Sequence, residues 1–144
     1  METQNYSNHH RFVPLFHVVL FGFIVLTMIG SIVNLYHSLG DHQRLYSASL
    51  IVVITFCLLL LFFFCRVFPL KAQDRAIRAE ENLRHFVLTG KLLDPRLTIR
   101  QIVGLRFASD EEFIALAKMA AQEILSGNDI KKSIKHWRAD TYRV

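Results

Sequence analysis

The sequence predicts an all-α protein: a transmembrane helical hairpin with two spans, followed by a small cytoplasmic helical region. Two long apolar stretches, residues 12–40 and 45–65, contain no Asp, Glu, Lys or Arg. The charges are segregated, because 24 of the 29 formal charges lie from Lys71 onward. The 74 residues from Lys71 to the end contain helix-capping patterns, and they are too few to cover two apolar helices with a soluble shell.

The first apolar stretch, residues 14–35, is long enough to cross a bilayer as a helix. Its 22 residues extend roughly 30 Å at 1.5 Å per residue. A cleaved signal peptide is the alternative, but the stretch is longer than the apolar region of such peptides, and no small-residue cleavage site follows it. We therefore expect a retained span, preceded by an N-terminal cytoplasmic segment at residues 1–13.

The second apolar stretch predicts a second transmembrane helix over residues 45–67. Leu, Ile, Val and Phe make up 14 of the 21 residues from position 45 to position 65, and this composition favours insertion. The external connector, residues 36–44, is short, so the spans are expected to be antiparallel neighbours. Cys57 and Cys65 lie eight residues apart, about 12 Å along a helix, which is too far for a disulfide between them.

Basic residues near the membrane ends predict the orientation of the hairpin. The connector contains Arg44 alone, whereas four basic residues follow the second span: Arg66, Lys71, Arg75 and Arg78. Because Lys and Arg are enriched in cytoplasmic loops, the C-terminal segment is expected in the cytoplasm, and with two spans the N-terminus is expected there too. The four residues also suit contact with anionic lipid headgroups, so topology and lipid contact both stay open as their role.

Small and polar residues on the first span predict a helix contact. Thr27, Gly30 and Ser31 form a patch that lets a second helix approach closely. Two interpretations stay open, which are ordinary packing within the hairpin and a contact between two copies of the chain.

Residues 68–90 are expected to form a juxtamembrane helix with Gly90 as its C-terminal cap. Proline disfavours a helical conformation of the residue before it, so Pro69 predicts a kink or a restart after the second span. Glu80 and Arg84 are expected to pair along the exposed helix. Five apolar residues, spaced alternately by four and three, predict an apolar stripe that packs against a partner helix: Ala72, Ala76, Ala79, Leu83 and Phe86.

Residues 91–144 are predicted to form a cytoplasmic helical module of three short helices. Two capping-box patterns open the first two helices, Thr98 with Gln101 and Ser109 with Glu112. The first helix is expected to end near Phe107 and the second near Leu125, with Gly127 as the stop. Asn128 is expected to cap the last helix.

Apolar residues at helical spacing predict how the module packs. Ile130, Ile134 and Trp137 follow one another at i, i+4 and i+7 on the last helix. The longer helix carries one apolar face: Phe113, Leu116, Ala117, Ala120 and Ile124. The patch from Phe113 to Trp137, together with the apolar stripe, is the predicted interaction surface.

The sequence indicates no enzyme, cofactor or metal site. It contains no P-loop, no G-x-G-x-x-G, no H-E-x-x-H and no G-x-S-x-G motif. His37, Asp41 and His42 share the connector, but no pair of histidines has a recognised ligand spacing. Two cysteines exclude a disulfide-rich secreted scaffold. Nucleic-acid binding is not expected, because 14 cations against 10 anions from Lys71 onward is a modest excess.

Three stretches of the sequence carry a resemblance to a known family: LKAQDRAIRAEENLRHFVLTGKLLD, LYSASL before it and the tail ending IKHWRADTYRV. The chain resembles a family of small two-span membrane proteins found in bacteria and described only as a domain of unknown function. The likeness covers nearly the whole chain. It implies a location in the bacterial inner (cytoplasmic) membrane and implies no activity.

Together these observations predict a multi-pass inner-membrane protein that is not an enzyme. The expected function is that of an accessory or scaffold protein that presents a helical cytoplasmic module for protein interaction. A small transport or channel component assembled from hairpins is the alternative, and a membrane-tethered nucleic-acid-binding regulator is a further one. The expected partners are the lipid bilayer, anionic lipids, and either a second copy or a larger membrane complex.

Overall fold

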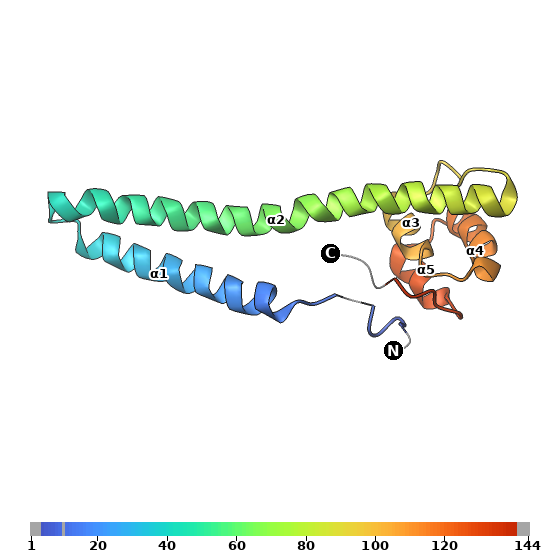
Figure 1. The fold of residues 1–144 in the computed structure, drawn as a ribbon, viewed down its shortest axis with the longest axis horizontal. Helices are drawn as coiled ribbons and strands as arrows, with labels where there is room; N and C mark the ends of the chain where they lie inside the picture. The colour runs from blue at the N-terminus through green and yellow to red at the C-terminus, as the bar shows by residue number, and fades with distance from the viewer. Residues whose placement is uncertain (1–3, 10, 141–144) are drawn as a thin grey trace. The chain divides into compact units, whose positions relative to one another are not determined.

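A computed structural model describes residues 4–9 and 11–140, and all the regular elements in this part of the chain are helical (Figure 1). The all-α prediction is therefore confirmed. The outermost parts of the predicted segments 1–13 and 91–144 lie outside the described residues. The helices follow one another as η1 (Leu15–Leu20), α1 (Phe21–His37), α2 (His42–Thr89), α3 (Ile99–Leu105), α4 (Asp110–Glu123) and α5 (Gly127–Ser133). They belong to two units, of which the first comprises residues 12–68 and the second residues 1–11 and 69–144.

The first unit contains the π-helical turn η1, the helix α1 and the first part of α2. Four residues, 38–41, separate α1 from α2, so the predicted connector 36–44 is longer than the observed one. The helices extend further because Asp41 caps α2. Its Oδ1 accepts a hydrogen bond from the backbone N–H of Gln43 at 3.0 Å, and its carbonyl accepts one from Leu45 at 2.8 Å.

Two buried hydroxyl groups join α1 to α2. The Ser31 and Thr55 oxygens lie 3.2 Å apart, and both side chains are buried. Of the predicted small-residue patch, only Ser31 faces α2. Gly30 is exposed, and the exposed Thr27 hydroxyl donates to the carbonyl of Phe23 in its own helix.

The helix α2 continues past Pro69, where the sequence predicted a kink or a restart. Pro69 lies inside a helix of 48 residues, so the predicted restart is wrong, and the second apolar stretch and the juxtamembrane segment form one helix. Proline removes one N–H donor, and only the carbonyl four residues earlier, at Cys65, loses its partner. The predicted C-terminal cap of this helix at Gly90 is confirmed. Gly90 adopts a left-handed φ of 72°, and its N–H donates to the carbonyl of Phe86 at 2.7 Å.

In the helical module, α3, α4 and α5 surround a core whose largest fully buried side chains include Phe107 and Phe113. The helix α3 begins with the predicted capping box of Thr98 and Gln101. It crosses α5 closely, because a Cβ atom on Gly127 would lie 2.6 Å from the carbonyl oxygen of Arg100. Gly127 allows this crossing because it has no Cβ atom. It is the first residue of α5, so the prediction that it ends the preceding helix is wrong.

The remaining boundaries in the module also differ from the prediction. The helix α4 ends at Glu123, and its C-cap residue Ile124 adopts a left-handed φ of 53°. The cap of α5 is Ser126, whose hydroxyl accepts from the N–H of Asp129 at 3.2 Å, and not Asn128. Trp137 lies beyond α5 in an extended segment that pairs with residue Ala108. Sequence spacing extended this last helix too far, because the backbone after Ser133 turns to bond with the chain that precedes α4.

Candidate functional site

Residues 69–89 of α2 present two different faces. The face toward the helical module buries Ile77 and Glu81, which are 6% and 5% exposed. Every member of the apolar stripe is exposed, with Leu83 at 63% and Phe86 at 50%. The module therefore covers a face that includes charged residues and leaves the stripe uncovered.

Arg84 joins α2 to the module through a network that the sequence did not reveal. Its guanidinium donates to Glu81 Oε2 at 3.0 Å, to the carbonyl of Ala108 at 2.7 Å and to Asp110 Oδ1 at 2.7 Å. It also lies 4.2 Å from the centre of the Phe113 ring. The Arg84 and Glu81 side chains are only 10% and 7% exposed.

The expected pair of Glu80 with Arg84 is wrong for the same reason. Arg84 forms its i,i+3 ion pair with Glu81, whose side chain points to the module, whereas Glu80 is exposed. Spacing alone allows both pairs, and the position of the module selects one of them. The signal available in the sequence was the run of Ile77, Glu81 and Arg84 at spacings of four and three, which defines a second face.

Phe113 and Trp137, both predicted to lie on an interaction surface, have internal roles. Phe113 is completely buried beneath Arg84, so this part of the prediction is wrong. An apolar face on a short helix marks what the helix buries, and here the helix buries it inside its own module. Trp137 is partly buried, and its ring centre lies 5.1 Å from that of Phe107 and 5.9 Å from that of His9.

The N-terminal segment binds to the C-terminal part of the chain. His9 is 4% exposed, and its Nε2 lies 3.2 Å from Nζ of Lys131. The side-chain amide of Gln4 pairs with the backbone of Asp140, accepting from its N–H at 2.7 Å and donating to its carbonyl at 3.4 Å. These contacts join residues that are more than 120 positions apart, and no local pattern in the sequence indicates them.

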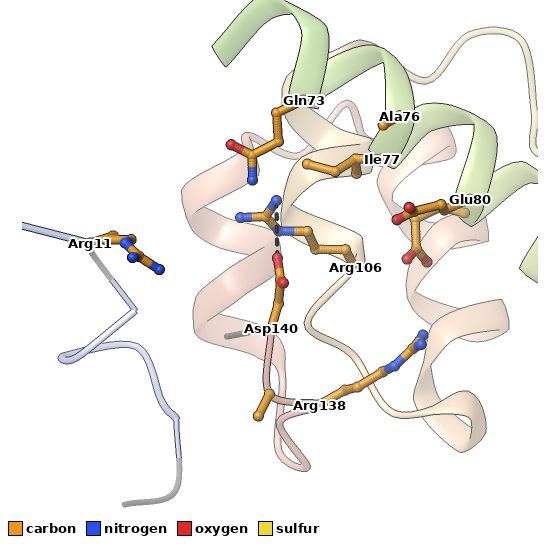
Figure 2. Close-up of a pocket in the computed structure, with 10 residues that line it drawn as sticks. Arg11, Gln73, Ala76, Ile77, Glu80, Arg106, Arg138 and Asp140 are labelled. Carbon is orange, nitrogen blue, oxygen red and sulfur yellow. Dashed lines mark ion pairs between the residues drawn. The ribbon is translucent and has the colours of Figure 1, made fainter. Parts of the chain in front are cut away.

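A cavity of about 610 Å³ opens beside α2 in this second unit (Figure 2). Figure 2 shows the Arg106 guanidinium between Gln73 and Asp140, and an ion pair of 3.3 Å joins Arg106 to Asp140. Charged residues of both signs line the cavity, and they are Arg11, Arg106, Arg138, Glu80, Glu81 and Asp140. Equal numbers of cations and anions give the cavity no preference for a ligand of one charge.

The basic residues that follow the second apolar stretch lie on the surface. Lys71, Arg75 and Arg78 are exposed, and Arg66 is partly exposed. Within the described part of the chain, none of the four forms an ion pair. They are therefore accessible to an external partner of negative charge.

The histidines and acids of the described residues do not come together in a metal site. Among residues 4–9 and 11–140, no three His, Cys, Asp or Glu side chains are placed to hold an ion. Asp41, which shares the connector with His37 and His42, caps α2 and pairs with Arg44 at 3.3 Å. Cys57 and Cys65 are free, exposed thiols.

Glu112 holds the extended segment that follows α5. Its carboxylate accepts hydrogen bonds from the N–H groups of Lys135 and His136, both at 3.0 Å, and from the His136 ring at 2.7 Å. Partial burial raises the pKa of Glu112, but these hydrogen bonds outweigh it and lower the pKa below its ordinary value. Because Glu112 turns to this segment, the predicted capping box with Ser109 does not form.

Replacing Glu112 by glutamine is expected to destabilise the module by about 1 kcal/mol at neutral pH, because two backbone N–H groups then lose a charged acceptor. A carboxylate with a lowered pKa stabilises the fold fully above its unfolded pKa, and this stabilisation is lost as the pH falls through the folded pKa. The difference in unfolding free energy between Glu112→Gln and the unmodified chain should therefore become smaller at acid pH.

Urea unfolding of the full chain in detergent, followed by the fluorescence of Trp137 across a pH series, measures this difference. Glu111→Gln is the matched control, because Glu111 is an exposed neighbour on the same helical turn. If Glu112→Gln lowers the free energy of unfolding by the same amount at every pH, the carboxylate charge has no part in the contact.

The fold and the site define an all-α protein that has two helices long and apolar enough to cross a membrane, Leu15–His37 and His42–Thr89, and a helical module bound to the end of the second. The chain belongs to the family of unknown function DUF6526, whose family model matches residues 1–144. No curated protein and no solved structure shows a significant match.

Proposed function

We propose that the chain is a two-span protein of the bacterial inner membrane with both ends in the cytoplasm. The contact between the N-terminal segment and the C-terminal part of the chain carries this proposal. Gln4 and His9 bind to Asp140 and Lys131, while the two candidate spans lie between these residues in the sequence. A chain returns to the side from which it started only after an even number of crossings. Arg66, Lys71, Arg75 and Arg78 support the cytoplasmic side for the module.

Within this topology, the protein acts as a non-enzymatic accessory or scaffold that presents its helical module to a protein partner. The exposure of Leu83 and Phe86 supports this function, since large apolar side chains that share one helix face with three alanines suit a helical partner. The hydroxyls of Ser31 and Thr55 bond to each other and to carbonyls of their own helices. They therefore serve packing between α1 and α2, and they give the transport alternative no support.

Labelling of single cysteines in spheroplasts tests the topology. In a full chain with Cys57→Ala and Cys65→Ala, a membrane-impermeant maleimide is expected to label Gly40→Cys without permeabilisation. It should label Ser7→Cys and Lys91→Cys only after the membrane is opened, because these positions lie on the cytoplasmic side. The labelling of each variant in permeabilised membranes is the control for reactivity.

Two results would contradict the proposal. One is labelling of Lys91→Cys in sealed spheroplasts, which would place the module outside. The other is release of the chain from membranes by alkaline carbonate, which would show that neither apolar helix is inserted.

A further inference from the structure

We propose that the apolar stripe binds the same stripe of a second copy of this chain, in a parallel, in-register, two-stranded coiled coil over residues 72–86. The inference rests on the proposed function, because two chains inserted in one membrane with the same orientation present α2 in parallel. A coiled coil of two heptads is marginal in water. Anchoring both chains in one membrane raises their effective concentration and offsets this weakness.

The spacing of the apolar stripe is that of a heptad repeat. Alternate steps of four and three place Ala76 and Leu83 at a positions, and they place Ala72, Ala79 and Phe86 at d positions. Alanines at three of these five positions allow the two helices to approach closely near Pro69. Leu83 and Phe86 supply the larger apolar contacts further along.

The contacts of α2 with its own module are compatible with this heptad repeat. Ile77 and Arg84 occupy b positions and Glu81 an f position, and these positions lie opposite the a and d residues. Ile77 and Glu81 are buried and Arg84 is 10% exposed, whereas every a and d residue of the stripe is exposed. Four other residues of the segment 72–86 are half-buried, and none of them occupies an a or d position: Gln73, Asp74, Asn82 and His85. The module can therefore remain bound to α2 while the stripe contacts another helix.

Charge complementarity selects a second copy in parallel orientation. Arg75 occupies a g position and Glu80 the following e position, five residues later. In a parallel, in-register pair, each g residue faces the next e residue of the other helix, so Arg75 faces the partner's Glu80 twice by symmetry. Both side chains are exposed, with Glu80 at the cavity of Figure 2, and neither forms an ion pair within the described residues. An antiparallel pair sets g against g and e against e, and it loses this match.

Membrane lipid is less suited than a second helix to cover the apolar stripe. Leu83 lies 14 residues beyond Pro69, which corresponds to about 21 Å along α2. The basic residues suited to headgroups, Lys71, Arg75 and Arg78, lie at the end of this segment close to Pro69. The largest apolar residues of the stripe therefore lie furthest from the second apolar stretch.

Disulfide crosslinking in native membranes tests the pairing. In the full chain with Cys57→Ala and Cys65→Ala, Ala79→Cys introduces a thiol at a d position. Mild oxidation should yield a disulfide-linked dimer at twice the mass of the chain. Arg78→Cys is the matched control, because it is an exposed neighbour at a c position that points away from the seam. Equal yields for the two variants, or no dimer from Ala79→Cys, would overturn the proposal.

Charge reversal tests the orientation and the identity of the partner. Arg75→Glu alone, and Glu80→Arg alone, should each lower the yield from Ala79→Cys roughly five-fold, because each creates two like-charge contacts. Co-expression of the two variants, each carrying Ala79→Cys and a different tag, should restore the yield in a mixed dimer. Restoration between chains cannot come from a role of Glu80 inside its own module. Failure of the mixed dimer to recover would overturn the pairing of Arg75 with the partner's Glu80.

The two proposals fail in different ways. A chain that resists carbonate and shows the expected maleimide labelling, but gives no Ala79→Cys dimer, overturns the coiled coil and leaves the membrane topology intact. A chain that carbonate releases overturns both.

Discussion

Replacing Arg84 by alanine is expected to lower the free energy of unfolding of the helical module by about 3–5 kcal/mol, because it breaks a buried ion pair by removing one partner. Glu81 is left as a buried carboxylate without its cation, and the Ala108 carbonyl loses a hydrogen bond of 2.7 Å. The Phe113 ring also loses its cation. The contact with Asp110 adds little, because that carboxylate is 65% exposed.

The fluorescence of Trp137, the single tryptophan, reports this loss during urea unfolding of the full chain in detergent. Arg78→Ala removes the same charge from an exposed position of α2 and should change the unfolding free energy by less than about 0.5 kcal/mol. The double change Glu81→Leu with Arg84→Met should recover much of the loss, since paired apolar side chains can replace a buried ion pair. A loss below about 1 kcal/mol for Arg84→Ala would show that the network does not hold α2 to the module.

Replacing Phe113 by alanine is expected to lower the free energy of unfolding by about 3–5 kcal/mol. The ring is fully buried, and its removal leaves a cavity in the core. A residue on an interaction surface would behave differently, since its truncation would impair binding and leave folding nearly unchanged. The same unfolding experiment therefore separates the two interpretations of this residue.

Phe86→Ala is the matched control for Phe113→Ala, because it removes the same side chain from an exposed position. Its effect on unfolding should stay near 0.5 kcal/mol or less, whereas it should reduce the Ala79→Cys dimer. Because Arg84 lies over Phe113, the double replacement Arg84→Ala with Phe113→Ala should cost less than the sum of the single replacements. Equal stabilities for Phe113→Ala and Phe86→Ala would contradict the assignment of Phe113 to the core.

The N-terminal segment links membrane topology to the stability of the module. His9 contacts Trp137, and Gln4 pairs with Asp140, so the module includes residues that precede the first candidate span. Described residues on both sides of the two candidate spans therefore contribute to this unit. In the proposed topology, insertion of both spans allows this arrangement, whereas a single crossing would place the two segments on opposite sides of the membrane.

Several local features could be predicted from the sequence because their interactions connect residues a few positions apart. Uncharged apolar stretches longer than 20 residues indicated the two candidate spans. The capping box of Thr98 with Gln101 and the left-handed Gly90 both formed as predicted. Each depends on hydrogen bonds between residues separated by three or four positions, so the pattern is visible without knowledge of the fold.

Where the spacing of residues allowed more than one hydrogen bond or ion pair, the tertiary structure alone decided which one formed. Glu112 had the spacing for a capping box but bonds to Lys135 and His136, and Arg84 had the spacing for Glu80 but pairs with Glu81. The sequence by itself determined the helical class, the two apolar stretches and the position of the apolar stripe. The tertiary structure decided which face of α2 the module covers. A charged face can be buried only when distant residues supply its hydrogen bonds, and periodicity along the chain carries no information about those residues.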